Sequence, residues 1–231
     1  MHFFLQASTT ALFSVRDLLL IAPEIILTLC ACVVLVMEVV LPYSKARWTA
    51  YFALASIGLA SVSLCALWSV NNSLLPLSGF YGMIRIDGFS IVFKIIFLVG
   101  AILTIAISLR YLDIEKEQRG EFYALVLFAT VGMMFLACAY DLIALYISLE
   151  LMAVCFYILV AFAKRERRSN EAAMKYFLLG AFSSGVLLYG MSLLFGLAGS
   201  TNLGDISESD CHLARGDANG GNERRGNHES V

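Results

Sequence analysis

Hydrophobic residues in this chain come in long, continuous runs and do not alternate with polar ones. Runs of about 20 residues are typical of membrane-spanning helices, because a hydrocarbon core of about 30 Å needs that length at 1.5 Å per residue. A membrane β-barrel would require alternation along each strand. The pattern therefore predicts an all-α, polytopic transmembrane helix bundle with about six spans, at 18–41, 49–70, 88–110, 122–140, 142–163 and 171–198.

The segments outside these runs complete the predicted organisation. Residues 1–17 are mildly apolar, and we expect them to form an outer N-terminal segment before a membrane domain at 18–203. Residues 71–87 contain one proline and two glycines among apolar residues, which predicts a loop that acts as a lid at the outer surface. Residues 204–231 have no aromatic side chain and much glycine and charge, which predicts a polar, disordered tail.

Basic residues indicate how the bundle is oriented. They gather in alternate loops, whose members are Lys45 and Arg47, then Arg110, Lys116 and Arg119, then Lys164, Arg165, Arg167 and Arg168. The positive-inside rule places these loops in the cytoplasm. The N-terminus is then expected outside, and an even number of spans puts the C-terminus outside as well.

Composition narrows the class of protein further. Hydrophobic residues make up 60% of the 231 residues and charged residues 15%, with a net charge of −2. Soluble domains are about 45–50% apolar and about 25% charged. A soluble enzyme, a disordered protein and a nucleic-acid binder are therefore excluded, and the lipid bilayer is the first partner that the sequence implies.

Ionisable residues within the apolar runs are the candidates for function, because a charge in the hydrocarbon core is costly and marks a pathway or a pair. Glu150 is the sharpest candidate, since it lies about 12 Å from the outer end of its predicted span. A carboxylate at that depth must pair, be protonated or line a hydrated cavity. We interpret Glu150 as part of a proton or ion relay. The alternative is a neutral, hydrogen-bonded acid with a structural role.

Two lysines and two further acids lie in other spans. Lys175 lies about 6–9 Å from the cytoplasmic end of the sixth span. The small residues of that span favour a helix packed within the bundle, so we expect the lysine to face inward. Its axial separation from Glu150, about 10–14 Å, predicts no direct salt bridge. Lys94 is explained equally by a side chain that reaches the interface and by a role in the proton path. Glu24 and Glu38 lie near the ends of the first span, where structural roles explain them.

The sequence shows no motif for a bound cofactor. It has no nucleotide-binding glycine motif, no histidine cluster for haem and no cysteine spacing for an iron–sulfur cluster. We therefore expect no cofactor and no metal in this chain, so that any redox role would belong to partner subunits.

Two stretches of sequence resemble a known family. SLELMAVCFYILVAF at 148–162 is followed by a basic loop and by SNEAAMKYFLLGAFSSG, and RIDGFSIVFKIIFL covers 85–98. Together they resemble the antiporter-like subunit N family of the bacterial proton-translocating NADH–quinone oxidoreductase, respiratory complex I. The resemblance extends over about residues 15–207.

This resemblance implies a membrane-arm subunit that takes part in proton translocation coupled to electron transfer from NADH to quinone. It implies that Glu150 is a principal ionisable residue of the proton path, and that Lys175 matches a lysine of the sixth span. NADH, flavin, iron–sulfur clusters and quinone are implied on the partner subunits. The implied partners are the other membrane-arm subunits and, through the complex, the quinone pool.

The chain also departs from the family. Members have many more spans, in two inverted repeats, and their path continues through lysines on later helices that have no match here. The family pattern ends near Gly204, and a polar tail follows it. A frameshift or premature stop at that point would explain the change. Two alternatives therefore stand beside the working subunit: a non-catalytic truncated fragment or assembly scaffold, and a subunit of a cation/proton antiporter.

Overall fold

The computed structural model describes residues 15–40, 46–71, 76–115, 120–163 and 167–209. Most of residues 1–17 and residues 210–231 of the expected tail lie outside this description. The labelled elements are α1 (Val15–Leu20), α2 (Ala22–Val40), α3 (Ala46–Asn71), β1 (Leu77–Gly79), β2 (Ile84–Ile86), α4 (Gly88–Glu115), α5 (Gly120–Cys138), α6 (Leu142–Val160) and α7 (Arg167–Ala198).

The described part of the chain is a helix bundle with several spans. Five helices are long and apolar enough to cross a membrane, namely Trp48–Ser69, Gly88–Leu109, Gly120–Cys138, Leu142–Val160 and Arg167–Ala198. The run expected as the first span, 18–41, is divided at Ile21 between α1 and α2. The predicted helical class is confirmed, and the chain is a multi-pass membrane protein with five candidate spans among the described residues where six were expected.

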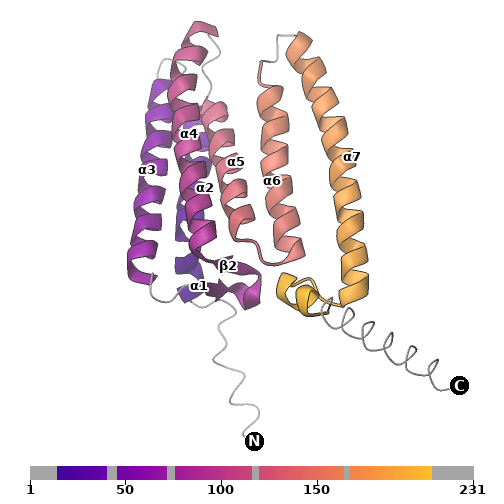
Figure 1. Cartoon of the computed structure of the whole chain (residues 1–231). Helices are drawn as coiled ribbons and strands as arrows, with labels where there is room; N and C mark the ends of the chain where they lie inside the picture. Colours follow the sequence, from indigo (N-terminus) through magenta and orange to yellow (C-terminus); the bar gives the residue numbers. More distant parts are fainter. Residues whose placement is uncertain (1–14, 41–45, 72–75, 116–119, 164–166, 210–231) are drawn as a thin grey trace, which may run out of the picture.

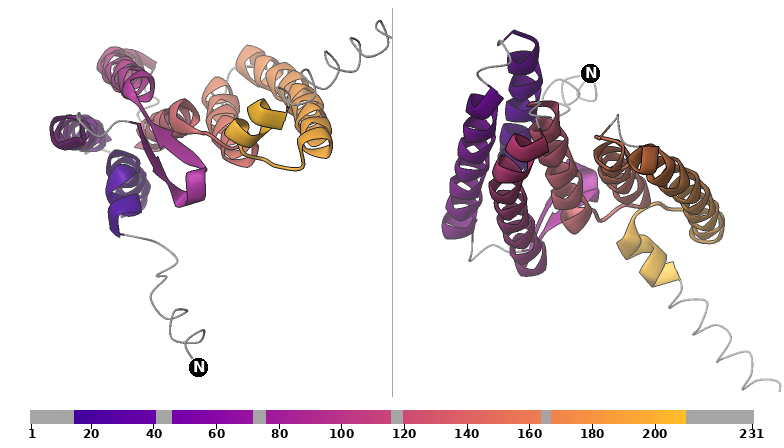
Figure 2. Two further views of the ribbon diagram at one scale, coloured as in Figure 1. Left: turned by 60° about the horizontal axis from the view of Figure 1, so that its bottom comes forward. Right: turned by 90° about the horizontal axis from the view of Figure 1, so that it is seen from above.

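Helix α5 forms the centre of the packing. It contacts α2, α3, α4 and α6, whereas α7 packs mainly on α6. Figures 1 and 2 show α2 to α5 gathered into one group, with α6 and α7 standing beside it. Accordingly, 11 of the 19 residues of α5 are buried, whereas α7 has one buried residue among 32. The core of fully buried side chains, including Leu27, Ile57, Ile105 and Leu127, therefore lies within the first group.

The segment expected as a loop at 71–87 contains a short antiparallel hairpin. Leu77 pairs with Ile86 and Gly79 with Ile84. Between the strands, Phe80, Tyr81 and Gly82 all have positive φ, at 52°, 55° and 85°, a conformation that is uncommon outside glycine. The side chains of Leu77 and Ile86 are buried, and the strands contact α1, α4 and α5. The hairpin therefore closes one end of the bundle (Figure 1).

A second connection at that end joins the start of α6 to the segment after α7. Asp141 caps α6 by accepting a hydrogen bond from the Ile143 N–H at 2.8 Å, and its other oxygen accepts one from the Thr201 hydroxyl at 2.6 Å. Residues 203–209 are helical, and Ile206 is buried. The segment at 204–209, expected as the start of a disordered tail, is therefore helical instead.

The Asp141 carboxylate is expected to stabilise this junction measurably. Asp141→Ala removes a helix cap and leaves the Thr201 hydroxyl without its acceptor, so the free energy of unfolding should fall by about 1–2 kcal/mol. Thermal unfolding of the purified chain in detergent would measure this change. Asp205→Ala is the matched control, because Asp205 makes an exposed bond to Ser200 and should change stability by about 0.5 kcal/mol or less. Equal effects of the two substitutions would contradict a capping role.

Candidate functional site

A buried ion pair joins the second and fourth helices. Lys94 of α4 and Glu24 of α2 are both 0% exposed, and Lys94 Nζ lies 2.6 Å from Glu24 Oε1. Glu24 stands in the first turn of α2, directly after Pro23. Lys94 lies within the first two turns of α4, which begins just after the hairpin. The two helix starts therefore bring opposite charges together inside apolar segments at the hairpin end of the bundle.

The partners of this pair are few. Lys94 Nζ and Glu24 Oε1 form a close ion pair. Glu24 Oε2 is buried without a hydrogen-bond partner among the described residues. The Cys138 thiol also interacts with Lys94. Burying two charges costs several kcal/mol per ion unless their attraction and further hydrogen bonds offset it.

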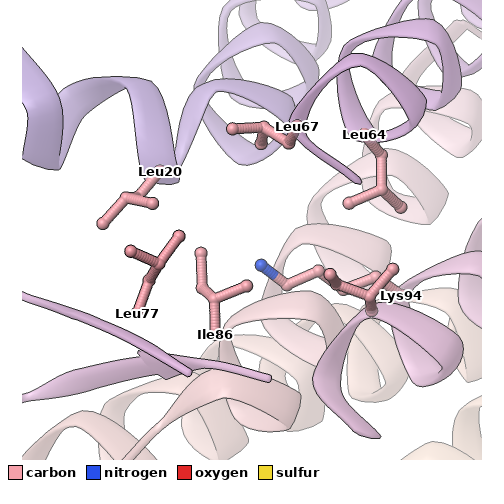
Figure 3. Close-up of a pocket in the computed structure, with 7 residues that line it drawn as sticks. Leu20, Leu64, Leu67, Leu77, Ile86 and Lys94 are labelled. Atoms are coloured by element: carbon pink, nitrogen blue, oxygen red, sulfur yellow. The ribbon is translucent and has the colours of Figure 1, made fainter. Parts of the chain in front are cut away.

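A small cavity lies beside the lysine. Its volume is about 10 Å³, and it is lined by Lys94 together with apolar side chains from α1, α3, the hairpin and α4: Leu20, Leu64, Leu67, Leu77, Ile86 and Ile91. Figure 3 shows the Lys94 side chain among these residues, with its nitrogen pointing toward the cavity. That volume is about the least that one water molecule needs. The apolar hairpin side chains Leu77 and Ile86 therefore stand between the ion pair and the end of the bundle.

Glu150 lies on a different face of the structure. It is partly exposed, and its Oε1 atom is buried without a hydrogen-bond partner in the described ranges. Ser148 and Met152 of α6 approach Gly132 of α5 closely, and at 100° per residue Glu150 points to the opposite side of α6. Tyr157, two turns further on, shares the side of Glu150 and packs on Tyr176 of α7. Glu150 is therefore directed toward the α7 side.

Lys175 does not face the interior of the bundle. Its ammonium pairs with Glu171 one turn earlier at 2.6 Å, and the two side chains are 71% and 62% exposed. The expectation of an inward-facing Lys175 is thus not met, because in this chain α7 has a neighbour on its α6 side and little else. Within the described residues Lys175 forms no ion pair with Glu150, as their axial separation predicts.

The sequence analysis missed the role of one acid and interpreted another correctly. The sequence analysis explained the position of Glu24 by the dipole at the start of the helix, but Glu24 forms an ion pair with Lys94. The signal was present in the sequence, because both residues lie near the same predicted membrane face and carry opposite charges. Glu38 has the structural role expected of it, since its Oε2 accepts a hydrogen bond at 2.7 Å from the N–H of Gly120 at the start of α5. In the ranges that the structure describes, no three His, Cys, Asp or Glu side chains gather as a metal site would require.

Comparisons with known sequences point to one family. The model of the family described as "NADH:quinone oxidoreductase/Mrp antiporter, TM" matches residues 139–223. This match continues to residue 223, beyond residue 207, where the sequence analysis ended the resemblance. The chain is 48% identical over 207 residues to NADH-quinone oxidoreductase subunit N 1 of Koribacter versatilis, covering 87% of this chain and 40% of that protein. It is 39% identical over 203 residues to NADH-quinone oxidoreductase subunit N of Trichlorobacter lovleyi, covering 88% and 41%.

Solved structures give the same result. A chain of respiratory complex I from Thermus thermophilus matches with a TM-score of 0.66 and 32% identity, over 79% of this chain and 38% of that one. A chain of the archaeal membrane-bound sulfane sulfur reductase shares the fold, with a TM-score of 0.69 at 21% identity, over 84% and 40%. This chain thus spans about 40% of the length of the curated relatives it matches. Over that length, it belongs to the antiporter-like subunit N family of NADH-quinone oxidoreductases.

Proposed function

We propose that this chain takes part in proton translocation as a membrane-arm component of an NADH–quinone oxidoreductase, coupled to electron transfer from NADH to quinone. The observation that carries the proposal is the Glu24–Lys94 ion pair, completely buried between two apolar helices. Intramembrane charges are costly and mark a pathway for protons or ions, or a pair. The relatives named NADH-quinone oxidoreductase subunit N supply the reaction to which such movement would be coupled.

The ionisable side chains would have distinct roles in this function. Glu150 takes up and releases a proton at its unpartnered buried oxygen. Lys94 either pairs with Glu24 or separates from it. This change in nearby charge alters how favourable it is for a side chain on a neighbouring helix to hold a proton. Lys175 joins the path when another helix packs on α7 and separates the Lys175 ammonium from Glu171. These three residues, Glu150, Lys175 and Lys94, are the proposed proton path within the chain.

The remaining components of the reaction would lie on other subunits. NADH, flavin, iron–sulfur clusters and quinone belong to those partners, and this chain contributes proton transfer alone. Its partners are the sister membrane-arm subunits and the lipid bilayer. We place the hairpin end on the outer face of a bacterial inner membrane, following the basic loops at the opposite helix ends.

A non-catalytic fragment or assembly scaffold is the second candidate. The specific observation in its favour is the exposure of α7, in which Ala173 is the one buried residue of 32. A scaffold would co-purify with membrane-arm subunits without contributing a proton path. Failure to co-purify with any of them would exclude both the subunit and the scaffold.

The proposal is tested with Glu150→Gln in the native host, which keeps the shape of the side chain and removes its titration. We expect NADH-driven proton uptake by inverted membrane vesicles to fall relative to NADH oxidation, because one carrier of the path is lost. Glu121→Gln is the control, because Glu121 is an exposed carboxylate in the first turn of α5, and it should leave uptake unchanged. An unchanged proton-to-electron ratio in Glu150→Gln vesicles that contain the assembled chain would remove Glu150 from the path.

A further inference from the structure

A crevice opens at the hairpin end of the bundle, and Glu150, Lys175 and Lys94 are not among the residues that line it. Its volume is about 200 Å³, and its lining comes from three parts of the chain. The hairpin region supplies Pro76, Ser78, Gly82 and Arg85, the turn between α5 and α6 supplies Tyr140, and the segment after α7 supplies Asn202. Figure 1 shows the hairpin and the segment after α7 at the same end of the bundle.

The charge of Arg85 is not neutralised by the described part of the protein. No described carboxylate lies within ion-pairing distance of its guanidinium, and its Nε is buried without a hydrogen-bond partner among the described residues. The neighbouring acids are engaged elsewhere: Asp87 accepts from the Ser90 N–H, and Asp141 accepts from Ile143 and Thr201. The contact that Arg85 does make is with the Tyr140 ring, 5.1 Å from the guanidinium carbon. A half-buried cation with unused donors favours an anionic ligand.

The walls of the crevice are fixed by hydrogen bonds to backbone carbonyls. The Tyr140 N–H donates to the Met83 carbonyl at 2.8 Å, and the Asn202 side-chain amide donates to the Gly82 carbonyl at 3.1 Å. The Leu203 N–H donates to the Tyr140 carbonyl at 3.1 Å. The hairpin, the α5–α6 turn and the segment after α7 are thus tied together around the crevice. A site held in place before binding loses less entropy when a ligand enters.

We propose that this crevice binds an anion of the phosphate class, either free inorganic phosphate or the phosphate of a lipid headgroup. The planar fork of Arg85 donates two parallel hydrogen bonds to phosphate oxygens. The Tyr140 and Ser78 hydroxyls, which line the same crevice, supply further donors. The crevice lies at the ends of membrane-spanning helices, where phosphates of lipid headgroups gather.

The test is the thermal stability of the purified full chain with two probes. Sodium phosphate is compared with sodium chloride at equal ionic strength, and phosphate-free dodecyl maltoside micelles are compared with and without phosphatidylglycerol. A probe present at about ten times its dissociation constant should raise the unfolding midpoint by about 3–6 °C. A shift with phosphate assigns the site to the free anion, and a shift with phosphatidylglycerol alone assigns it to the headgroup.

Variants decide whether Arg85 is responsible. Arg85→Gln should abolish the shift, and Tyr140→Phe, which keeps the ring under the guanidinium, should reduce it. Arg167→Gln is the control, because Arg167 is an exposed cation at the start of α7, and its shift should equal that of the unsubstituted chain. No shift with either probe, or an equal shift in Arg85→Gln, would overturn the proposal. Because the readout is ligand-dependent stability, this result is independent of whether the chain pumps protons.

Discussion

Replacing Lys94 by leucine should lower the free energy of unfolding by about 3–5 kcal/mol, the largest effect expected of any single substitution in this chain. The reason is that the Glu24 carboxylate, 0% exposed, would remain buried without its counter-ion. Glu24→Leu should cost a similar amount, because it leaves the Lys94 ammonium unpaired. Reversible unfolding of the detergent-solubilised chain, titrated with denaturant, measures both changes.

The double variant Glu24→Leu/Lys94→Leu separates structure from function. Replacing both members of a buried ion pair by apolar residues is often neutral, or stabilising by about 1–4 kcal/mol, so the double variant should regain the stability that each single variant loses. Lys175→Leu is the control, since its exposed pair with Glu171 contributes only about 0.3–0.5 kcal/mol. Losses in the single variants as small as in Lys175→Leu would mean that the Glu24–Lys94 contact carries little energy. A stable double variant with a lowered proton-to-electron ratio would support a functional pair.

The spans were predictable because the membrane itself sets their length and composition. The apolar runs expected at 122–140 and 142–163 correspond to α5 (Gly120–Cys138) and α6 (Leu142–Val160) within a few residues. The run at 88–110 lies within α4. In lipid, every backbone N–H and C=O must form a hydrogen bond within the protein, so a long apolar run forms a helix. Local sequence is therefore enough to place these elements.

The partners of the ionisable residues could not be predicted in the same way. Glu24 and Lys94 are 70 residues apart in the sequence, and their contact depends on how α2 and α4 pack, which hydropathy does not report. The small residues of α7 favour close helix packing, yet Gly185 and Gly190 have nothing within 4 Å of an added Cβ. The small residues of α7 indicate a surface that another helix could pack against. The exposure of Lys175 depends on whether such a helix is present.

We expect Gly132→Ala to push α6 away from α5 and so to disrupt the contact that positions Glu150. A Cβ at Gly132 would lie 2.9 Å from the Met152 nitrogen and 3.0 Å from the Ser148 carbonyl oxygen. These are backbone atoms, so α6 must move as a whole. Overpacking of this kind costs about 1–3 kcal/mol, and thermal unfolding should show the loss. Gly185→Ala is the matched control in α7: it meets no atom within 4 Å and should gain up to about 1 kcal/mol from helix propensity. If both alanines stabilise the chain, α5 and α6 are not in close contact at Gly132. If Gly132→Ala alone destabilises it, the displaced α6 should also lower Glu150-dependent proton uptake in native vesicles, since that helix carries the carboxylate.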